Sequence, residues 1–201
     1  MRKFICFIIL ALCISIARAQ RNFGVFAGAN LINLTEPENY PFQGSSNGVG
    51  LHIGLSYDLE ISKNINFSPR IVYSQQGTTK SKAEEAGSND GSASSVDFKY
   101  KLDYLNIPLQ FKFFNQPYIL AGPYAGYVLN EERFNRDFGD LKSKVDYGFN
   151  LGVGYNIEGF FTELNFQQGF ATLIEVDETP RSNGFKLRNT IIQLSFGYKF
   201  R

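Results

Sequence analysis

A strict alternation of large apolar residues with small or polar ones is the feature that most constrains this chain. It is clearest over residues 146–159, DYGFNLGVGYNIEG, where an aromatic or aliphatic residue occupies every second position. Because successive side chains of a strand point to opposite faces, this segment predicts a strand with one apolar face and one thin, polar face. An apolar face can meet a protein core or lipid, and these two environments belong to different classes of protein.

The same alternation recurs along the chain, as in LHIGLSYDLEI, INFSPRIVYSQ and the C-terminal TIIQLSFGYKFR. Helix-period patterns are scarce, so the fold class is predicted to be all-β. Counting the alternating segments gives eight strands, at about 21–34, 48–61, 64–78, 98–113, 117–130, 144–157, 159–172 and 187–200.

Two of these strands are irregular. The fourth changes phase near Tyr104, which a β-bulge would explain. The fifth, PYILAGPYAGYVL, is apolar on both faces, so its inward and outward sides cannot be assigned from the pattern. Pro69, Pro108 and Pro123 lie inside predicted strands, and because proline removes a ladder donor, each requires a bulge or an irregular rung.

The connections between the strands alternate in length. Three are tight, at 62–64, 114–116 and 158–159. Four are long and polar, at roughly 35–47, 79–97, 131–143 and 173–186. Antiparallel neighbours joined in this order place every long loop at one end and every short turn, with both termini, at the other. The chain is therefore predicted to form an eight-stranded antiparallel up-and-down barrel.

The N-terminus has the features of a secretory signal peptide. Arg2-Lys3 precedes an apolar run over residues 4–16, and Ala17-Arg18-Ala19 supplies an A-x-A cleavage site. The apolar run is shorter than the roughly 20 residues that a spanning helix requires. We predict that residues 1–19 are a cleaved signal peptide and that residues 20–201 form one barrel domain.

Cleavage would remove both cysteines, Cys6 and Cys13, and with them any disulfide, thiolate chemistry or cysteine-based metal site. It would take the basic count from 20 to 17 against 19 acidic residues, a net charge of −2, which gives no reason to expect nucleic acid as a partner. No cofactor is predicted. Nor is a metal site, since SNDG at 88–91 lacks the spaced carboxylates and closing Glu of a calcium loop.

Glycines in the polar rows favour lipid as the solvent of the apolar faces. In a soluble, lipocalin-like barrel the aromatic rows would overfill the narrow interior of eight strands, and the glycines would weaken an exposed face. With the faces reversed, large residues meet hydrocarbon, and Gly, Ser and Asn fill the lumen. Barrel closure also pairs the backbone groups that lipid cannot satisfy. A transmembrane barrel is therefore the preferred prediction over a lipocalin-like one.

Four segments carry a resemblance to a known family: LDYLNIPLQFKF, PYILAGPYAGYVL, YGFNLGVGYNI and IQLSFGYKF. With these, the mature chain resembles the outer-membrane β-barrel family of Bacteroidetes-type bacteria, the PorT-like group, related in architecture to OmpA and OmpX barrels. The resemblance implies an eight-stranded barrel in the cell outer membrane, with short periplasmic turns and long extracellular loops. It implies no single activity, although some relatives serve protein secretion. One departure is Arg201, which follows the aromatic Phe200 that the assembly machinery usually reads as the last residue.

His52, the only histidine, lies on the predicted lumen face together with Ser56 and Asp58. Some outer-membrane barrels are hydrolases with a Ser-His-acid set. Residues four and six positions apart on a strand are, however, roughly 13 and 20 Å apart, too far for a nucleophile–base pair. We therefore predict that His52 fills the lumen and that the chain has no catalytic residues.

The alternation sends charged side chains into the lumen, where an unpartnered charge costs several kcal/mol. We predict that they form an ion-pair network that plugs the barrel, with Arg70 and Glu163 at its centre. A selectivity filter is the alternative, although eight strands leave no aqueous pore. The network is predicted to comprise Arg70, Glu163, Lys112, Asp58 and Asp146.

Aromatic residues near the strand ends are predicted to form the interfacial girdles of a membrane barrel, with a recognition surface as the alternative. These residues are Tyr57, Tyr73, Tyr100, Tyr118, Tyr155, Tyr198 and Phe200.

The sequence thus predicts a non-enzymatic outer-membrane barrel with a structural, adhesion or secretion-accessory role, carried by its extracellular loops or a partner surface. A small porin-like channel and a soluble ligand-binding barrel are the alternatives. The expected partners are outer-membrane lipid and lipopolysaccharide, the barrel-assembly machinery during biogenesis, and a protein that the sequence does not identify.

Overall fold

A computed structural model describes residues 22–35, 47–84, 95–134, 142–176 and 185–200. This part of the chain is all-β, and it contains no helix long and apolar enough to cross a membrane. The strands are β1 (Phe23–Thr35), β2 (Asn47–Tyr57), β3 (Leu59–Ser62), β4 (Ile65–Glu84), β5 (Ser95–Phe113), β6 (Tyr118–Phe134), β7 (Val145–Ile157), β8 (Phe160–Gly169), β9 (Ile174–Val176) and β10 (Phe185–Lys199).

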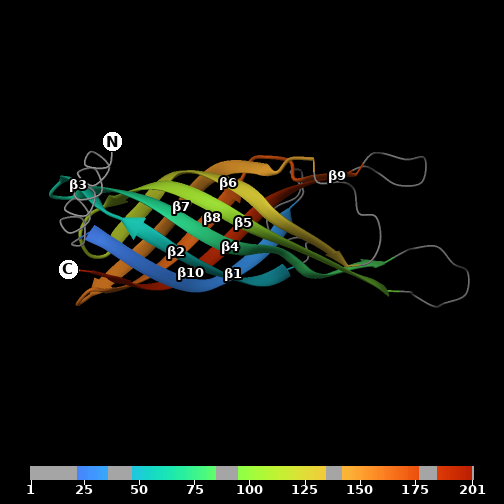
Figure 1. Ribbon diagram of the computed structural model, residues 1–201, viewed down its shortest axis with the longest axis horizontal. Helices are drawn as coiled ribbons and strands as arrows, with labels where there is room; N and C mark the ends of the chain where they lie inside the picture. Colours follow the sequence, from blue (N-terminus) through green and yellow to red (C-terminus); the bar gives the residue numbers. More distant parts are fainter. Residues whose placement is uncertain (1–21, 36–46, 85–94, 135–141, 177–184, 201) are drawn as a thin grey trace, which may run out of the picture.

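Eight of these strands close into an antiparallel barrel. The order is β1-β2-β4-β5-β6-β7-β8-β10, and pairing of β1 with β10 closes the sheet on itself. The two short strands are additions: β3 continues the line of β2 along β4, and β9 pairs with β10. The predicted eight-stranded up-and-down barrel is confirmed, and each barrel strand is a neighbour of the next one in sequence (Figure 1).

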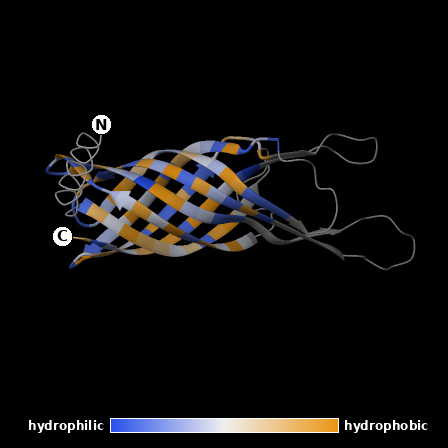
Figure 2. Cartoon of the chain, viewed as in Figure 1, coloured by the Kyte–Doolittle hydropathy of each residue, from blue (hydrophilic) through white to orange (hydrophobic). Residues whose placement is uncertain are grey.

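The alternating rows face as the sequence predicts. On β7, Leu151 and Tyr147 are 50% and 57% exposed on the outside of the barrel, whereas Asp146 and Asn150 on the opposite face are buried. The same division holds on β2, where Leu51 points outward. Figure 2 shows hydrophobic and hydrophilic residues alternating along the strands of the barrel. The large side chains therefore cover the outside, and the small and polar ones line the lumen.

The tight turns after β3, β5 and β7 lie at one end of the barrel, and the strand ends that the long predicted connections join lie at the other (Figure 1). The turn between β7 and β8 consists of Glu158 and Gly159, with φ values of 48° and 94°, a left-handed geometry that suits a two-residue hairpin. The N–H of Phe200 donates to the carbonyl oxygen of Phe23 over 2.9 Å, which holds the end of β10 beside the start of β1 at the short-turn end.

Three neighbouring strands extend beyond their predicted limits. β4 continues to Glu84 and β5 begins at Ser95, and these two residues still pair with each other. β6 continues to Phe134, which pairs with Lys99 of β5. The β6–β7 ladder, in contrast, reaches only as far as Val145. The β4–β5–β6 sheet therefore projects past the barrel at the long-loop end.

The irregularities of the fourth and fifth predicted strands are resolved by the sheet register. The β5–β6 register shifts between Asp103 and Tyr104, which confirms the predicted bulge. The same ladder pairs Pro108 with Tyr124, and its next pair is Phe111 with Ala121. The two pairs between them, beside Pro123, are missing, although the register is the same on both sides. β6 turns four large side chains into the lumen, namely Tyr118, Leu120, Tyr124 and Val128.

Candidate functional site

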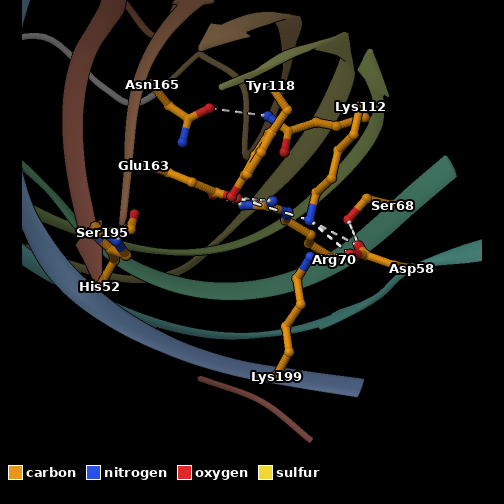
Figure 3. Close-up of polar contacts among 11 residues, drawn as sticks. His52, Asp58, Ser68, Arg70, Lys112, Tyr118, Glu163, Asn165, Ser195 and Lys199 are labelled. Carbon is orange, nitrogen blue, oxygen red and sulfur yellow. Dashed lines mark hydrogen bonds and ion pairs between the residues drawn. The ribbon is translucent and has the colours of Figure 1, made fainter. Parts of the chain in front are cut away.

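An ion pair spans the lumen near the short-turn end. Arg70 of β4 donates from Nη1 to Glu163 Oε2 over 2.5 Å and from Nη2 to Oε1 over 2.8 Å. Both side chains are almost completely buried, at 3% and 0% exposure. β4 and β8 are four strands apart in an eight-stranded barrel, so they lie on opposite walls. This bidentate pair therefore crosses the full width of the lumen (Figure 3).

Three further side chains extend the pair into a cluster. Lys112 Nζ lies 2.9 Å from Asp58 Oδ1 and 3.9 Å from Glu163 Oε1. Asp58 also accepts a 2.6 Å hydrogen bond from Ser68 Oγ and lies 2.6 Å from Lys199 Nζ. Asp58 is held between β2 and β3, opposite the β4 segment that carries Ser68. We call Arg70, Glu163, Lys112, Asp58 and Lys199 the lumen cluster (Figure 3).

Aromatic rings surround the lumen cluster. The Arg70 guanidinium carbon lies 5.2 Å from the centroid of the Phe26 ring, and Lys112 Nζ lies 5.8 Å from that of Phe161. Tyr118 Oη donates to Glu163 Oε1 over 2.8 Å. These rings exclude water and attract the cations through their negative faces.

Tyr118 corrects one of the girdle predictions, because it is 2% exposed and lies in the lumen. Its strand is apolar on both faces, so periodicity did not reveal this orientation. Tyr73, Tyr155, Tyr198 and Phe200 are 37–46% exposed on the outside, and Tyr57 is half-buried. The side chain of Tyr100 lies outside the described residues.

Of the five charged residues predicted to share one network, the structure brings together Arg70, Glu163, Lys112 and Asp58. Asp146 is separate: it is at the start of β7 and accepts a 2.8 Å hydrogen bond from Tyr124 Oη. Lys199 takes part instead. The alternation placed Lys199 on the lumen face of the last strand, and this was the signal that could have identified it.

His52 forms a second polar group in the lumen. Its Nε2 lies 2.8 Å from Ser195 Oγ and its Nδ1 lies 2.8 Å from Asn30 Oδ1. Asn30 in turn donates to Ser74 Oγ over 3.0 Å. Ser56, the serine closest in sequence on the same strand face, is not the partner, as the strand spacing predicted. Ser195 comes from β10, two strands away across β1.

A serine, a histidine and an asparagine joined in this order by hydrogen bonds can form a catalytic triad, in which the histidine activates the serine as a nucleophile. Here, however, His52 and Ser195 are 4% and 2% exposed inside the lumen, and a Cβ on Gly28 would lie 2.7 Å from the His52 ring. Ser195 is thus buried inside the barrel and not open to solvent. The hydrogen bonds of His52 therefore satisfy buried polar atoms between neighbouring strands.

The described residues contain no group of three or more His, Cys, Asp or Glu side chains that could hold a metal ion. In the lumen cluster each carboxylate is already bound by cations. This arrangement supplies electrostatic cross-links between strands, and its geometry suits closure of the lumen.

Comparison with known proteins identifies the kind of barrel. A family model described as "Outer membrane protein beta-barrel domain" matches residues 17–175, which is most of the chain. The chain belongs to this outer-membrane β-barrel family. No curated protein matches it in sequence.

Solved structures agree with the fold of this outer-membrane barrel. Neisserial surface protein A is 15% identical with a TM-score of 0.50, over 89% of this chain and 97% of that protein. Two other similar structures have lower TM-scores. Ail, the attachment invasion locus protein of Yersinia pestis, is 15% identical (0.42; 88% and 98% covered), and outer membrane protein AlkL is 16% identical (0.37; 89% and 90% covered).

Membership of this family answers the question that the apolar rows raised. The protein resides in the outer membrane, so the exposed outer rows face lipid and the polar rows face the lumen. The soluble lipocalin-like alternative is excluded. Residues 1–19, predicted to be a signal peptide, lie outside the described residues.

Proposed function

We propose that this outer-membrane barrel is a closed, non-enzymatic scaffold that presents a recognition surface at its long-loop end, in a structural or adhesion role. The observation that carries this proposal is the Arg70–Glu163 pair, which joins opposite walls of the lumen by two hydrogen bonds of 2.5 and 2.8 Å. A lumen crossed by a buried ion pair is unsuited to conduction. The function then belongs to the outer surface and the loops.

The projecting β4–β5–β6 sheet supports the same proposal. In this sheet, Ser95 of β5 still pairs with Glu84 of β4, and Lys99 of β5 pairs with Phe134 of β6. At the short-turn end, in contrast, two residues connect β3 with β4, four connect β5 with β6, and two connect β7 with β8. A protein with this asymmetry presents ordered backbone to one side of the membrane only, and we assign that side to the cell exterior.

Conductance separates this proposal from the small porin-like channel. The purified, refolded barrel in a planar lipid bilayer should give no steady openings. Replacing Arg70 and Glu163 together by Ala removes the bridge across the lumen and should raise the frequency of openings. Steady ohmic openings of the unmodified protein would contradict the closed-barrel proposal.

The position of the recognition surface can be tested on intact cells. An epitope inserted between residues 89 and 90, in the polar connection of β4 and β5, should be detected by antibody without permeabilisation. The matched control is the same epitope inserted after Asn115 in a short turn, which should be detected only after the outer membrane is opened. The reverse labelling would contradict the proposed orientation. Folding of both proteins is checked by heat-dependent gel mobility.

A secretion-accessory role is the second candidate, and the observation that favours it is the resemblance of residues 102–113 and 192–200 to the PorT-like group of Bacteroidetes-type barrels. Co-purification of other membrane proteins with the solubilised barrel would support it. Lipopolysaccharide and outer-membrane lipid are the proposed partners of the apolar belt, and the barrel-assembly machinery is the proposed partner during biogenesis.

A further inference from the structure

The lumen cluster contains one more positive than negative charge. Three cations, Arg70, Lys112 and Lys199, share two carboxylates, Asp58 and Glu163, through contacts of 2.5 to 3.9 Å. A buried charge without a counter-charge costs several kcal/mol in a protein interior. The Lys199 side chain is 21% exposed, so water solvates part of this excess charge, and one more anion or the loss of one proton would neutralise the rest.

The other buried carboxylates among the described residues cannot supply that anion. Asp146 begins β7 at the long-loop end, where it is bound by Tyr124. Asp103 lies at the bulge of β5, nine residues from Lys112 toward the same end. Lys199, in contrast, is the last residue of β10 at the short-turn end.

Unpartnered hydrogen-bond donors lie beside the excess charge. Lys199 pairs with Gly24, Gly24 with Ser56, and Ser56 with Arg70, so these four residues form one row across β10, β1, β2 and β4. Ser56 and Arg70 are 3% and 4% exposed. Within the part of the chain that the structure describes, Ser56 Oγ and Arg70 Nε have no hydrogen-bond partner.

The row brings these donors to one place in the lumen. Side chains of directly paired residues on one face have Cβ atoms about 4.5–5.5 Å apart, so the Ser56 hydroxyl lies beside the stem of the Arg70 side chain. Gly24 has no side chain to separate Ser56 from Lys199. A Cβ there would lie 2.6 Å from Ser56 Oγ and 3.6 Å from Lys199 Cγ.

We propose that this place is an anion-binding site for a halide-sized monovalent anion, chloride in the cell, held by Ser56 Oγ–H and Arg70 Nε–H and neutralising the charge that Lys199 adds. Both donors are at most 4% exposed, which favours a small ion over a bulky carboxylate ligand or phosphate ester. The side chain of Lys199 is 21% exposed and marks the route from the short-turn end. This site is independent of the role proposed for the loops.

The test uses the full mature barrel, refolded in zwitterionic detergent. Its urea midpoint is measured as sodium bromide or chloride replaces sodium gluconate at constant ionic strength. The midpoint should rise with halide and then saturate, because a ligand that binds only the folded state stabilises it by mass action. A bromide-soaked crystal should show an anomalous peak between Ser56 Oγ and Arg70 Nε.

Three variants make the result specific. Ser56→Ala removes one donor and Lys199→Met removes the excess charge, so both should lose the halide-dependent rise. Lys63→Met changes the same charge at the same end of the barrel on an exposed turn, and it should keep the rise. A wild-type urea midpoint that does not change with halide would overturn the site. The excess positive charge of the lumen cluster would then be removed by a lysine that has lost a proton. An equal halide response in Lys199→Met would overturn the site as well.

Discussion

Arg70 and Glu163 are 93 residues apart in sequence, yet they form a bidentate cross-link between opposite walls of this barrel. Their two hydrogen bonds measure 2.5 and 2.8 Å, and Lys112 lies 3.9 Å from the same carboxylate. The pair is enclosed by Tyr118 and Phe26. A charge left behind here would have no water to solvate it.

Breaking this pair should destabilise the barrel strongly. Arg70→Met leaves Glu163 with only its weaker partners, and loss of one member of a buried pair costs about 3–5 kcal/mol. The free energy is measured by urea titration in lipid vesicles, with heat-dependent gel mobility as the readout. The control is Lys101→Met, which breaks the exposed 3.9 Å contact with Glu132 and should cost less than about 1 kcal/mol.

The double replacement Arg70→Met with Glu163→Gln tests the cause of that loss. With both charges gone, neither member of the pair is left without its direct partner, so the double variant should be more stable than Arg70→Met alone. Two losses that simply add would show that the residues act separately, contrary to the geometry.

Gly154 should not tolerate a side chain. A Cβ at this position would overlap the ring of Tyr118, which is itself fixed by Glu163. Gly154→Val should therefore cost about 1–3 kcal/mol through overpacking. Ala125→Val is the matched control, because Ala125 is exposed on the lipid-facing side of β6. Equal urea midpoints for the two variants would argue against a filled lumen at this level.

Charge on the outer face should be penalised according to depth. Leu151 lies in the middle of β7 and is 50% exposed, whereas Phe160 lies at the start of β8 beside the short turn. Leu151→Arg should cost about 2–4 kcal/mol and Phe160→Arg about 0–1 kcal/mol in a bilayer. Urea titration in vesicles gives both values. A larger penalty at Phe160 than at Leu151 would contradict this position of the apolar belt along the barrel.

The His52 group should contribute to stability. Asn30→Leu removes the partner of His52 Nδ1 and of Ser74 Oγ, and each buried polar atom left unpaired costs about 1–3 kcal/mol. Asn115→Leu, at an exposed turn, should change the urea midpoint little. Fluorophosphonate should not label Ser195 in the folded barrel, because the serine is buried. Labelling at Ser195 would contradict the structural role and revive a catalytic one.

The alternation of residues by itself determined which side chains face inward or outward along most of the barrel. This was possible because facing is a local property with a period of two residues. It identified the lumen positions of Arg70, Glu163 and Asp58, and the connection lengths identified the barrel. It did not work for Tyr118, because its strand is apolar on both faces.

Only the tertiary structure decided which inward side chains meet. Contacts across a lumen depend on strand register and barrel closure, which set the height of each residue relative to the opposite wall. These relations joined Arg70 to Glu163 and His52 to Ser195, 143 residues away, and they separated Asp146 from the cluster to which its charge and facing had assigned it. Facing is a property of one strand, whereas partnership is a property of the closed barrel.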